Sequence, residues 1–241
     1  MTQIGTLAEK SLHAGIKAWY GRSSDQFEVQ VDGFVIDIVR GEQLIEIQTR
    51  HFGAMKRKLK RLLADHPVLL LHPIAQEKWI VRETAVGEPI SRRKSPKKGQ
   101  PLDLFSELMR IPHLLPHPNL VVGAVLTRQE EVWRDDGQGS WRRKGWSLHD
   151  HHLLEVVGLH TFAAPNDLLA LLPPDLPPQF TNKQLAKLAK IQPNLAQRIT
   201  YTLSRCQVID LVGKQGRSNL YQFQSDLKLK SNRPIAQRPF P

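Results

Sequence analysis

The sequence predicts an α/β protein whose larger domain has the element order αβββαββ and whose small C-terminal domain combines two helices with a hairpin. Three observations lead to this prediction. Apolar residues alternate between positions 26 and 48, helical periodicity flanks them at 4–19 and 55–63, and a different pattern begins after the proline-rich segment 173–178. A chain of 241 residues is long enough for one large core and a second domain.

The first helix is expected over residues 4–19, where apolar residues recur at helical spacing. Three strands should follow as a meander. QFEVQV turns at Asp32-Gly33 into FVIDIV, and a Gly41-Glu42 turn leads into LIEIQ. The meander therefore accounts for the middle of the larger domain.

The second helix, expected over residues 55–63, has apolar residues on one side and basic residues on the other. After it, PVLLL predicts a strand covered on both faces, and EKWIVRE predicts a further strand. Residues 87–101, rich in proline, glycine and cations, indicate an exposed loop. A short helix is expected over 102–110, and a DDGQG turn should join LVVGAVLTRQEEVW and SWRRKGW into a hairpin.

A second helix-forming pattern begins after the linker. Thr181 and Gln184 make a capping box, and Phe180 with Leu185 makes a hydrophobic staple, so a helix should start there. A further helix follows the IQPN break, and VIDLV, GKQGR and SNLYQF predict a hairpin, which together indicate a winged helix-turn-helix. The expected divisions are a larger domain 1–172 with an extension 87–172, a linker 173–179, a winged helix 180–226 and a flexible basic tail 227–241.

The composition indicates a polyanionic partner. The chain has 34 Lys and Arg against 23 Asp and Glu, a net charge of +11, and nucleic acid is the usual partner of so basic a protein. The single cysteine, Cys206, excludes an internal disulfide framework and a multi-cysteine zinc site. No signal-peptide pattern and no apolar run near the ~18 residues of a membrane helix is present. We therefore expect a cytoplasmic protein without a membrane partner.

Two acids in the meander are the most informative feature of the sequence. The Gly41-Glu42 turn sets a register in which Asp37 and Glu46 lie opposite each other. Opposed residues have Cβ atoms about 4.5–5.5 Å apart, and like charges so close repel unless a cation lies between them. Clustered carboxylates of this kind hold Mg²⁺ or Mn²⁺, and the Ile47 carbonyl would add an oxygen ligand. The alternative is that both acids are solvated on an exposed sheet face.

With these acids in this order of elements, residues 1–85 resemble the PD-(D/E)xK nuclease superfamily, which has the restriction-endonuclease-like fold. The resemblance implies a Mg²⁺-dependent deoxyribonuclease. Glu9, Asp37 and Glu46 would bind the metal, and Gln48 would orient the attacking water. Glu9 also completes a capping box with Thr6, and this purely structural role stays open.

Gln48 departs from the pattern of that superfamily, which usually has lysine at this position. Glutamine can neither carry a positive charge nor supply a proton, so it can only orient water or phosphate by hydrogen bonding. Some members do carry glutamine there. Alternatively, Lys56 or Lys60 on the following helix would substitute for the lysine, and both are also candidates for DNA contact.

The C-terminal domain is expected to bind duplex DNA. Between positions 180 and 224 the chain has seven cations and one acid, a balance that contact with DNA phosphates explains. For the basic segment around position 93, phosphate contact and simple solvation stay open; for the tryptophans around position 141, base stacking is an alternative to the favoured packing across strands. The expected DNA contacts are Asn194, Gln197, Arg198, Tyr201, Arg205, Lys214 and Arg217, the open basic residues are Arg92, Arg93 and Lys94, and the tryptophans are Trp133, Trp141 and Trp146.

The sequence therefore predicts a metal-dependent endonuclease that the winged helix positions on duplex DNA. The alternative is a catalytically inactive nuclease fold serving as a DNA-binding transcriptional or structural regulator, with Gln48 as the sign of lost activity. An RNA substrate is a third reading. Because one site of this type cuts one strand, duplex cleavage would imply a homodimer or two separate events.

Overall fold

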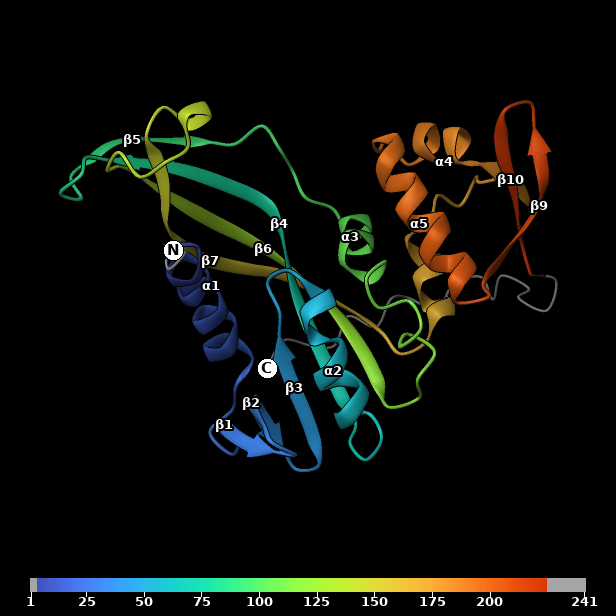
Figure 1. The fold of residues 1–241 in the computed structure, drawn as a ribbon, viewed down its shortest axis with the longest axis horizontal. Helices are drawn as coiled ribbons and strands as arrows, with labels where there is room; N and C mark the ends of the chain where they lie inside the picture. The colour runs from blue at the N-terminus through green and yellow to red at the C-terminus, as the bar shows by residue number, and fades with distance from the viewer. Residues whose placement is uncertain (1–3, 225–241) are drawn as a thin grey trace.

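The computed structural model describes residues 4–224 and the side chains of residues 11–224. It is a mixed α/β protein with a seven-stranded mixed sheet and a three-stranded antiparallel sheet accompanied by helices (Figure 1). The predicted α/β class is therefore confirmed. The predicted tail 227–241 lies outside the described residues, as do positions 225 and 226. Within the described part, no helix is both long enough and apolar enough to span a membrane.

The larger sheet has the strand order β1-β2-β3-β4-β6-β7, and β5 pairs with β4. Its strands and helices are α1 (Ile4–Tyr20), β1 (Gln26–Val31), β2 (Phe34–Arg40), β3 (Gln43–Ile47), α2 (Phe52–Leu62), β4 (Val68–Glu83), β5 (Pro89–Lys94), η1 (Pro101–Leu104), α3 (Phe105–Leu108), β6 (Leu120–Asp135), η2 (Trp141–Arg143), β7 (Trp146–Phe162) and η3 (Pro165–Leu171). The C-terminal elements are β8 (Gln179–Thr181), α4 (Asn182–Leu188), α5 (Pro193–Arg205), β9 (Ile209–Gln215) and β10 (Ser218–Phe223).

Strands β1, β2 and β3 form the predicted antiparallel meander. Gly41 has φ of 57°, which a residue without a Cβ adopts readily at the first position of a tight turn. The turn sets the first three pairs of the β2–β3 register as predicted, Arg40 with Gln43, Val39 with Leu44, and Ile38 with Ile45, but the predicted pair of Asp37 with Glu46 does not form.

Helix α2 connects β3 to β4, which runs parallel to β3. The two separate strands predicted from PVLLL and EKWIVRE are one continuous strand, so that prediction is wrong. β4 stays extended because β6 pairs with it along its whole length, with one irregularity between Ala75 and Glu77. Polar residues in the middle of β4 interrupt its apolar pattern, so periodicity alone does not show that it is one strand.

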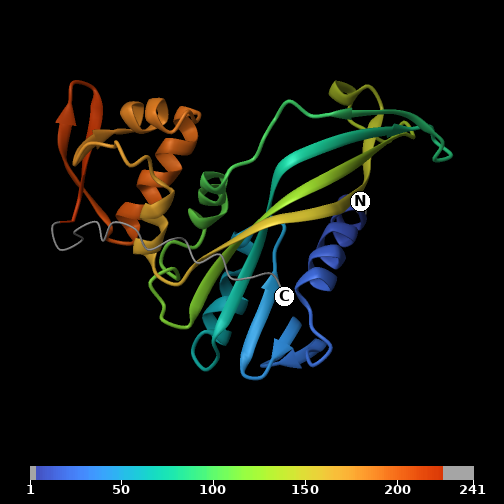
Figure 2. The same cartoon turned by 180° about the vertical axis from the view of Figure 1, so that it is seen from behind.

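The outer parts of β4, β5, β6 and β7 form what we call the arm, residues 77–94 and 128–155, which extends away from α4 and α5 (Figure 2). The predicted loop 87–101 is partly wrong, because Pro89–Lys94 is β5 and pairs with β4. The strand that pairs with β6 also differs from the predicted segment SWRRKGW. The segment 141–143 is the 3₁₀ turn η2, and β7 begins only at Trp146.

The C-terminal helices and hairpin form as predicted. Thr181 Oγ1 accepts a hydrogen bond from the Gln184 backbone N–H at 3.3 Å, and Gln184 Oε1 accepts one from the Thr181 N–H at 2.8 Å. Phe180 and Leu185 are fully buried beside this capping box. β9 and β10 form an antiparallel hairpin, and β8 pairs with the other edge of β10.

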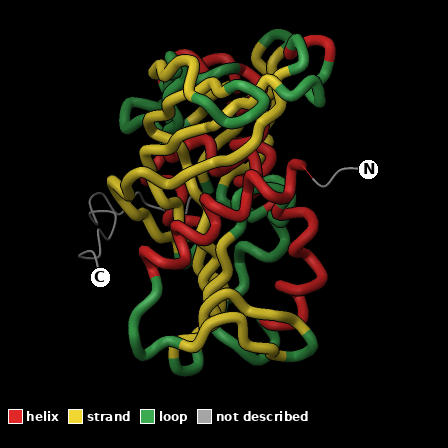
Figure 3. The backbone as a smooth tube through the Cα atoms, turned by 90° about the vertical axis from the view of Figure 1, so that its left-hand side faces the viewer, coloured by secondary structure: helices red, strands yellow, loops and turns green. Residues whose placement is uncertain are grey.

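Apolar side chains fill both faces of the larger sheet, and helices lie beside its strands (Figure 3). On one face, Leu12 and Ile16 of α1 pack with Ile38 and Ile45. On the other, a cluster from α2 and α3 continues into α4 and α5 and includes Leu176 of the predicted linker. The division into domains stays a prediction, and the buried core continues across it.

Removal of the Thr181 hydroxyl should destabilise the protein, since one N–H at the start of α4 loses its partner. We expect Thr181→Val, which keeps the size of the side chain, to lower the free energy of unfolding by about 1 kcal/mol in urea titrations. Thr181→Ser keeps the hydroxyl and should lose less. Equal losses in both variants would contradict the capping role.

Candidate active site

β2 and β3 separate at the position of the two acids. Their pairing ends at Ile38 and Ile45, one residue before Asp37 and Glu46. Beyond this point each strand keeps only its other neighbour, β1 for β2 and β4 for β3. The backbone N–H of Ile47 is therefore free to donate to Asp37 Oδ2, at 2.8 Å. We call this place, with Asp37, Glu46 and Ile47, the fork.

Asp37 is held ionised by its neighbours. His13, on α1, places Nε2 3.1 Å from Asp37 Oδ2. Burial by itself would raise the pKa of Asp37, but the hydrogen bond and charge interaction with His13, the Ile47 N–H and nearby Lys17 together lower it. Asp37 therefore carries a negative charge at neutral pH.

The pKa of Glu46 is shifted in the opposite direction. Its side chain is almost completely buried, and Lys58 of α2 places Nζ 2.6 Å from Glu46 Oε1. The pKa of Glu46 is raised to about 7: burial raises it most, the Lys58 ammonium partly offsets this, and the charge of Asp37 adds to the rise. Near pH 7, the protonated and ionised forms of Glu46 are therefore present in similar amounts.

The fork thus combines two neighbouring carboxyl groups whose pKa values are shifted in opposite directions. Such a pair is typical of sites where one acid stays charged and the other takes up and releases a proton. Ion pairs with a purely structural role shift pKa values in the same way. The two shifts therefore become evidence for catalysis only when a substrate binds at the fork.

Gln48 and Glu9, the other two predicted catalytic residues, are less constrained by the structure. The Gln48 side-chain amide donates to the Arg50 carbonyl, and the Gln48 carbonyl accepts a hydrogen bond from His72 Nδ1 at 2.8 Å. Its role in orienting water stays a prediction. Glu9 belongs to the part of α1 whose side chains lie outside the described residues, so its role as a metal ligand also stays a prediction.

The structure brings two residues to the fork that the sequence analysis did not select, His13 and Lys58. His13 lies one helical turn after Glu9, a spacing that places both on one face of α1. Lys58 borders the buried Met55 and Leu59 of α2, whereas the predicted substitutes Lys56 and Lys60 are exposed. Of the α2 lysines, Lys58 is thus the one that contacts Glu46.

The carboxylate oxygens at the fork are of the kind that a hard divalent cation prefers. Among the described side chains, no group of three His, Cys, Asp or Glu residues is arranged to hold a metal ion. Mg²⁺, however, commonly uses one or two protein carboxylates and keeps several waters. Asp37 and Glu46 are such a pair, although a cation there would compete with Lys58 for Glu46.

The predicted DNA-binding residues separate into two groups. Most of them are exposed on α5 and on the β9–β10 hairpin, and Arg205 stacks on Tyr201 with its guanidinium carbon 5.6 Å from the ring centroid. Arg198 instead donates to Ser106 Oγ of α3 at 2.8 Å, so it lies on the side of α5 that faces α3. The exposed residues are Asn194, Gln197, Tyr201, Arg205, Lys214 and Arg217.

The basic residues of β5 also differ from one another. Arg92 pairs with Glu130 at 2.7 Å, and Lys94 pairs with Glu77 at 2.5 Å. Both cations lie over the ring of Trp79. Arg93 points to the opposite face and has no carboxylate partner among the described side chains.

Comparison with known proteins places the chain in a family. Residues 10–163, which include the fork and the arm, match the family described as Domain of unknown function (DUF8091). An uncharacterized protein of Treponema pallidum (strain Nichols) is 30% identical over 221 residues, which cover 91% of this chain and 87% of the relative. No solved structure matches the chain. The chain therefore belongs to the DUF8091 family.

Proposed function

We propose that this protein hydrolyses phosphodiester bonds in DNA, using Mg²⁺ or Mn²⁺ at the fork, and holds duplex DNA with its C-terminal helices and hairpin. The observation that carries the proposal is the pair of carboxyl groups of Asp37 and Glu46, brought together where β2 and β3 separate. Carboxylates in this arrangement bind the metal ions that phosphoryl transfer uses.

The order of elements supports a restriction-endonuclease-like core. Helix α1, the β1–β3 meander, α2 and the parallel β4 follow one another as in that fold, and the acids lie on its second and third strands. The elements β8, α4, α5, β9 and β10 support a winged helix-turn-helix, with α5 as the recognition helix and the β9–β10 hairpin as the wing.

Each residue at the fork has a defined task in this proposal. Asp37, already ionised through His13, would hold the metal, and Glu46 would complete the pair by releasing its proton. When bound, the metal supplies an activated water and positive charge for the phosphate. Lys58 supplies the cation that Gln48 lacks, because it reaches the same acid from α2.

The exposed face of α5 supports duplex DNA as the substrate. Its polar and basic side chains follow one another at helical spacing, and Lys214 and Arg217 extend the charge to the hairpin. Such a surface contacts bases through the helix and phosphates through its cations. Arg198 is not part of this proposed surface, because its guanidinium is bonded to Ser106.

A second candidate function is DNA binding without hydrolysis. Two observations favour it: Lys58 already neutralises Glu46, and the described side chains include no group of three metal-ligating residues. The protein would then act on DNA as a regulator, with the fork serving only to stabilise the fold. Cleavage assays separate the two candidates.

Supercoiled plasmid should be nicked in the presence of Mg²⁺ or Mn²⁺ but not in EDTA. Asp37→Asn and Glu46→Gln should each slow nicking about 100-fold or more, because the metal contributes several kcal/mol to the transition state. Glu42→Gln removes an exposed acid from the adjacent turn and is the matched control. Plasmid binding without metal-dependent nicking would refute hydrolysis and support the regulator.

The stability of the protein should depend on the protonation of Glu46. The folded state binds more protons than the unfolded state between the ordinary pKa of 4.5 and the raised value of about 7, so stability falls as pH rises through this window. Relative to Glu46→Gln, the parent should lose about 3 kcal/mol across it.

Urea unfolding between these pH values measures the loss. Excess Mg²⁺ should reduce it, since the metal binds the ionised carboxylate of the folded state. A parent protein with the same pH dependence as Glu46→Gln would show that Glu46 has no raised pKa. A loss that Mg²⁺ does not change would argue against a metal at the fork.

Salt titrations test the proposed DNA surface. Arg205→Gln and Lys214→Gln should each weaken duplex binding and reduce the slope of log K against log salt by about 0.9, as expected for one lost phosphate contact. Fluorescence anisotropy with a labelled duplex measures this slope. Arg22→Gln removes an exposed charge near the start of β1 and should leave the slope unchanged. Equal slopes in all variants would exclude this surface.

A further inference from the structure

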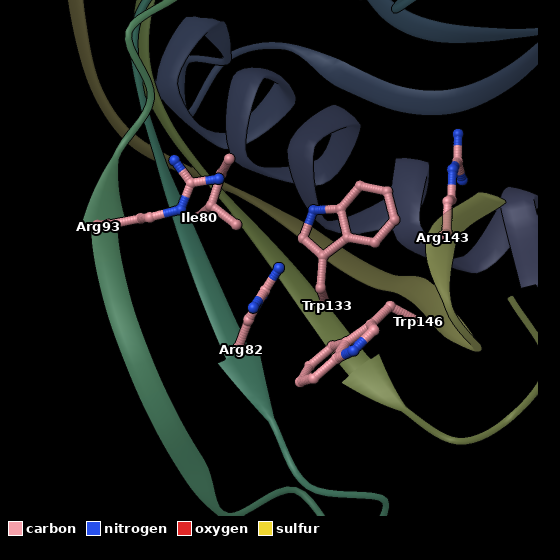
Figure 4. Close-up of a pocket in the computed structure, with 6 residues that line it drawn as sticks. All are labelled: Ile80, Arg82, Arg93, Trp133, Arg143 and Trp146. Atoms are coloured by element: carbon pink, nitrogen blue, oxygen red, sulfur yellow. The ribbon is translucent and has the colours of Figure 1, made fainter.

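A pocket of about 220 Å³ lies on the arm, outside the fork (Figure 4). The strand register explains its composition. Ile80 pairs with Arg93, and Arg82 pairs with Trp133, so these side chains gather on one face of the sheet. Trp146 joins them from the start of β7. The lining residues are Ile80, Arg82, Arg93, Trp133, Arg143 and Trp146.

Three of these residues are arginines without a carboxylate partner. Among the described side chains, no acid forms an ion pair with Arg82, Arg93 or Arg143. Other cations of the arm are paired, for example Lys78 with Glu131 at 2.7 Å. Like charges around one pocket repel one another, and an anion bound between them would remove this repulsion. The pocket therefore suits an anionic ligand.

The two tryptophans of the pocket indicate that the ligand also has an aromatic part. The Arg143 guanidinium carbon lies 5.0 Å from the Trp133 ring centroid, and that of Arg82 lies 4.8 Å from the Trp146 ring centroid. In Figure 4 both indoles lie between these two arginines. Aromatic rings and guanidinium planes in alternation are the surfaces on which unpaired bases stack.

The size of the pocket limits the ligand further. Its volume of about 220 Å³ is below the roughly 300–1,000 Å³ of sites for drug-sized ligands. A single base with a phosphate at the rim fits this volume, whereas a dinucleotide cofactor does not. One nucleotide is a ligand with a planar aromatic part and an anionic group at this size.

We propose that the arm pocket binds one unpaired nucleotide, with the base against Trp133 and Trp146 and the phosphate against Arg82, Arg93 and Arg143. A free nucleoside monophosphate and an unpaired nucleotide within a single strand share this chemistry. The proposal concerns the arm alone and does not depend on hydrolysis at the fork. Binding can therefore be measured in EDTA, where the fork is inactive.

The test compares two probes on the full chain, thymidine monophosphate by calorimetry and a labelled oligothymidylate by anisotropy. Trp133→Leu and Arg93→Gln should each weaken binding about tenfold or more, the effect of losing one stacked ring or one charged partner. The matched controls are Trp141→Leu, at a residue that is 83% exposed and outside the pocket, and Arg92→Gln, the neighbour of Arg93 on β5. Both controls should bind as the parent does.

The outcome also identifies the source of the nucleotide. If the parent binds both probes and the pocket variants weaken both, a free nucleotide is enough to fill the pocket. If the parent binds only the oligothymidylate and the pocket variants weaken that binding, the pocket holds part of a single strand. Thymidine and inorganic phosphate alone should each bind at least about tenfold more weakly than the monophosphate in the first case. Arg93 is exposed on an edge strand, so Arg93→Gln remains informative even if Trp133→Leu fails to fold.

Two results would overturn the proposal. One is that neither probe binds the parent protein in EDTA. The other is that Arg92→Gln weakens binding as much as Arg93→Gln. Binding would then depend on the positive charge of β5 in general and not on the pocket.

Discussion

The separation of β2 from β3 is the constraint on which the candidate active site depends. A two-residue turn at Gly41 fixes the register, and after three pairs β2 and β3 are no longer paired with each other, although β1 stays paired with β2 and β4 with β3. At that point the backbone no longer fills its own hydrogen bonds across the gap, and Asp37 accepts one from Ile47. The same geometry buries Glu46 beneath α2, where the cost of a buried charge raises its pKa to about 7.

Electrostatic pairing distinguishes the functional candidates from the rest of a strongly basic protein. On the arm, many cations are neutralised by a glutamate on a neighbouring strand, as Arg134 is by Glu83 at 2.9 Å. The three pocket arginines and the exposed cations of α5 and its hairpin have no such partner among the described side chains. The net charge of +11 favours anionic partners, and in our proposals these two surfaces bind different ones, an unpaired nucleotide and a duplex.

Local sequence patterns predicted the elements whose signals are short in range. The Gly41 turn and the Thr181 capping box each depend on residues a few positions apart, and both formed as predicted. Two strands of the arm, β5 and most of β7, were missed for the opposite reason. β5 is exposed along its whole length and β7 lacks strict alternation, so only pairing with distant strands makes them extended.

The sequence by itself determined the α/β class, the meander, and the turn register that leads up to Asp37 and Glu46, because turn geometry and a period of two act locally. Only the tertiary structure decided that Lys58 contacts Glu46, that Arg198 is bonded to Ser106, and that Arg93 faces a pocket. These outcomes depend on how α2, α5 and β5 pack against segments far away in the chain. Neither charge nor periodicity specifies which of several similar cations will meet a given partner across such a contact.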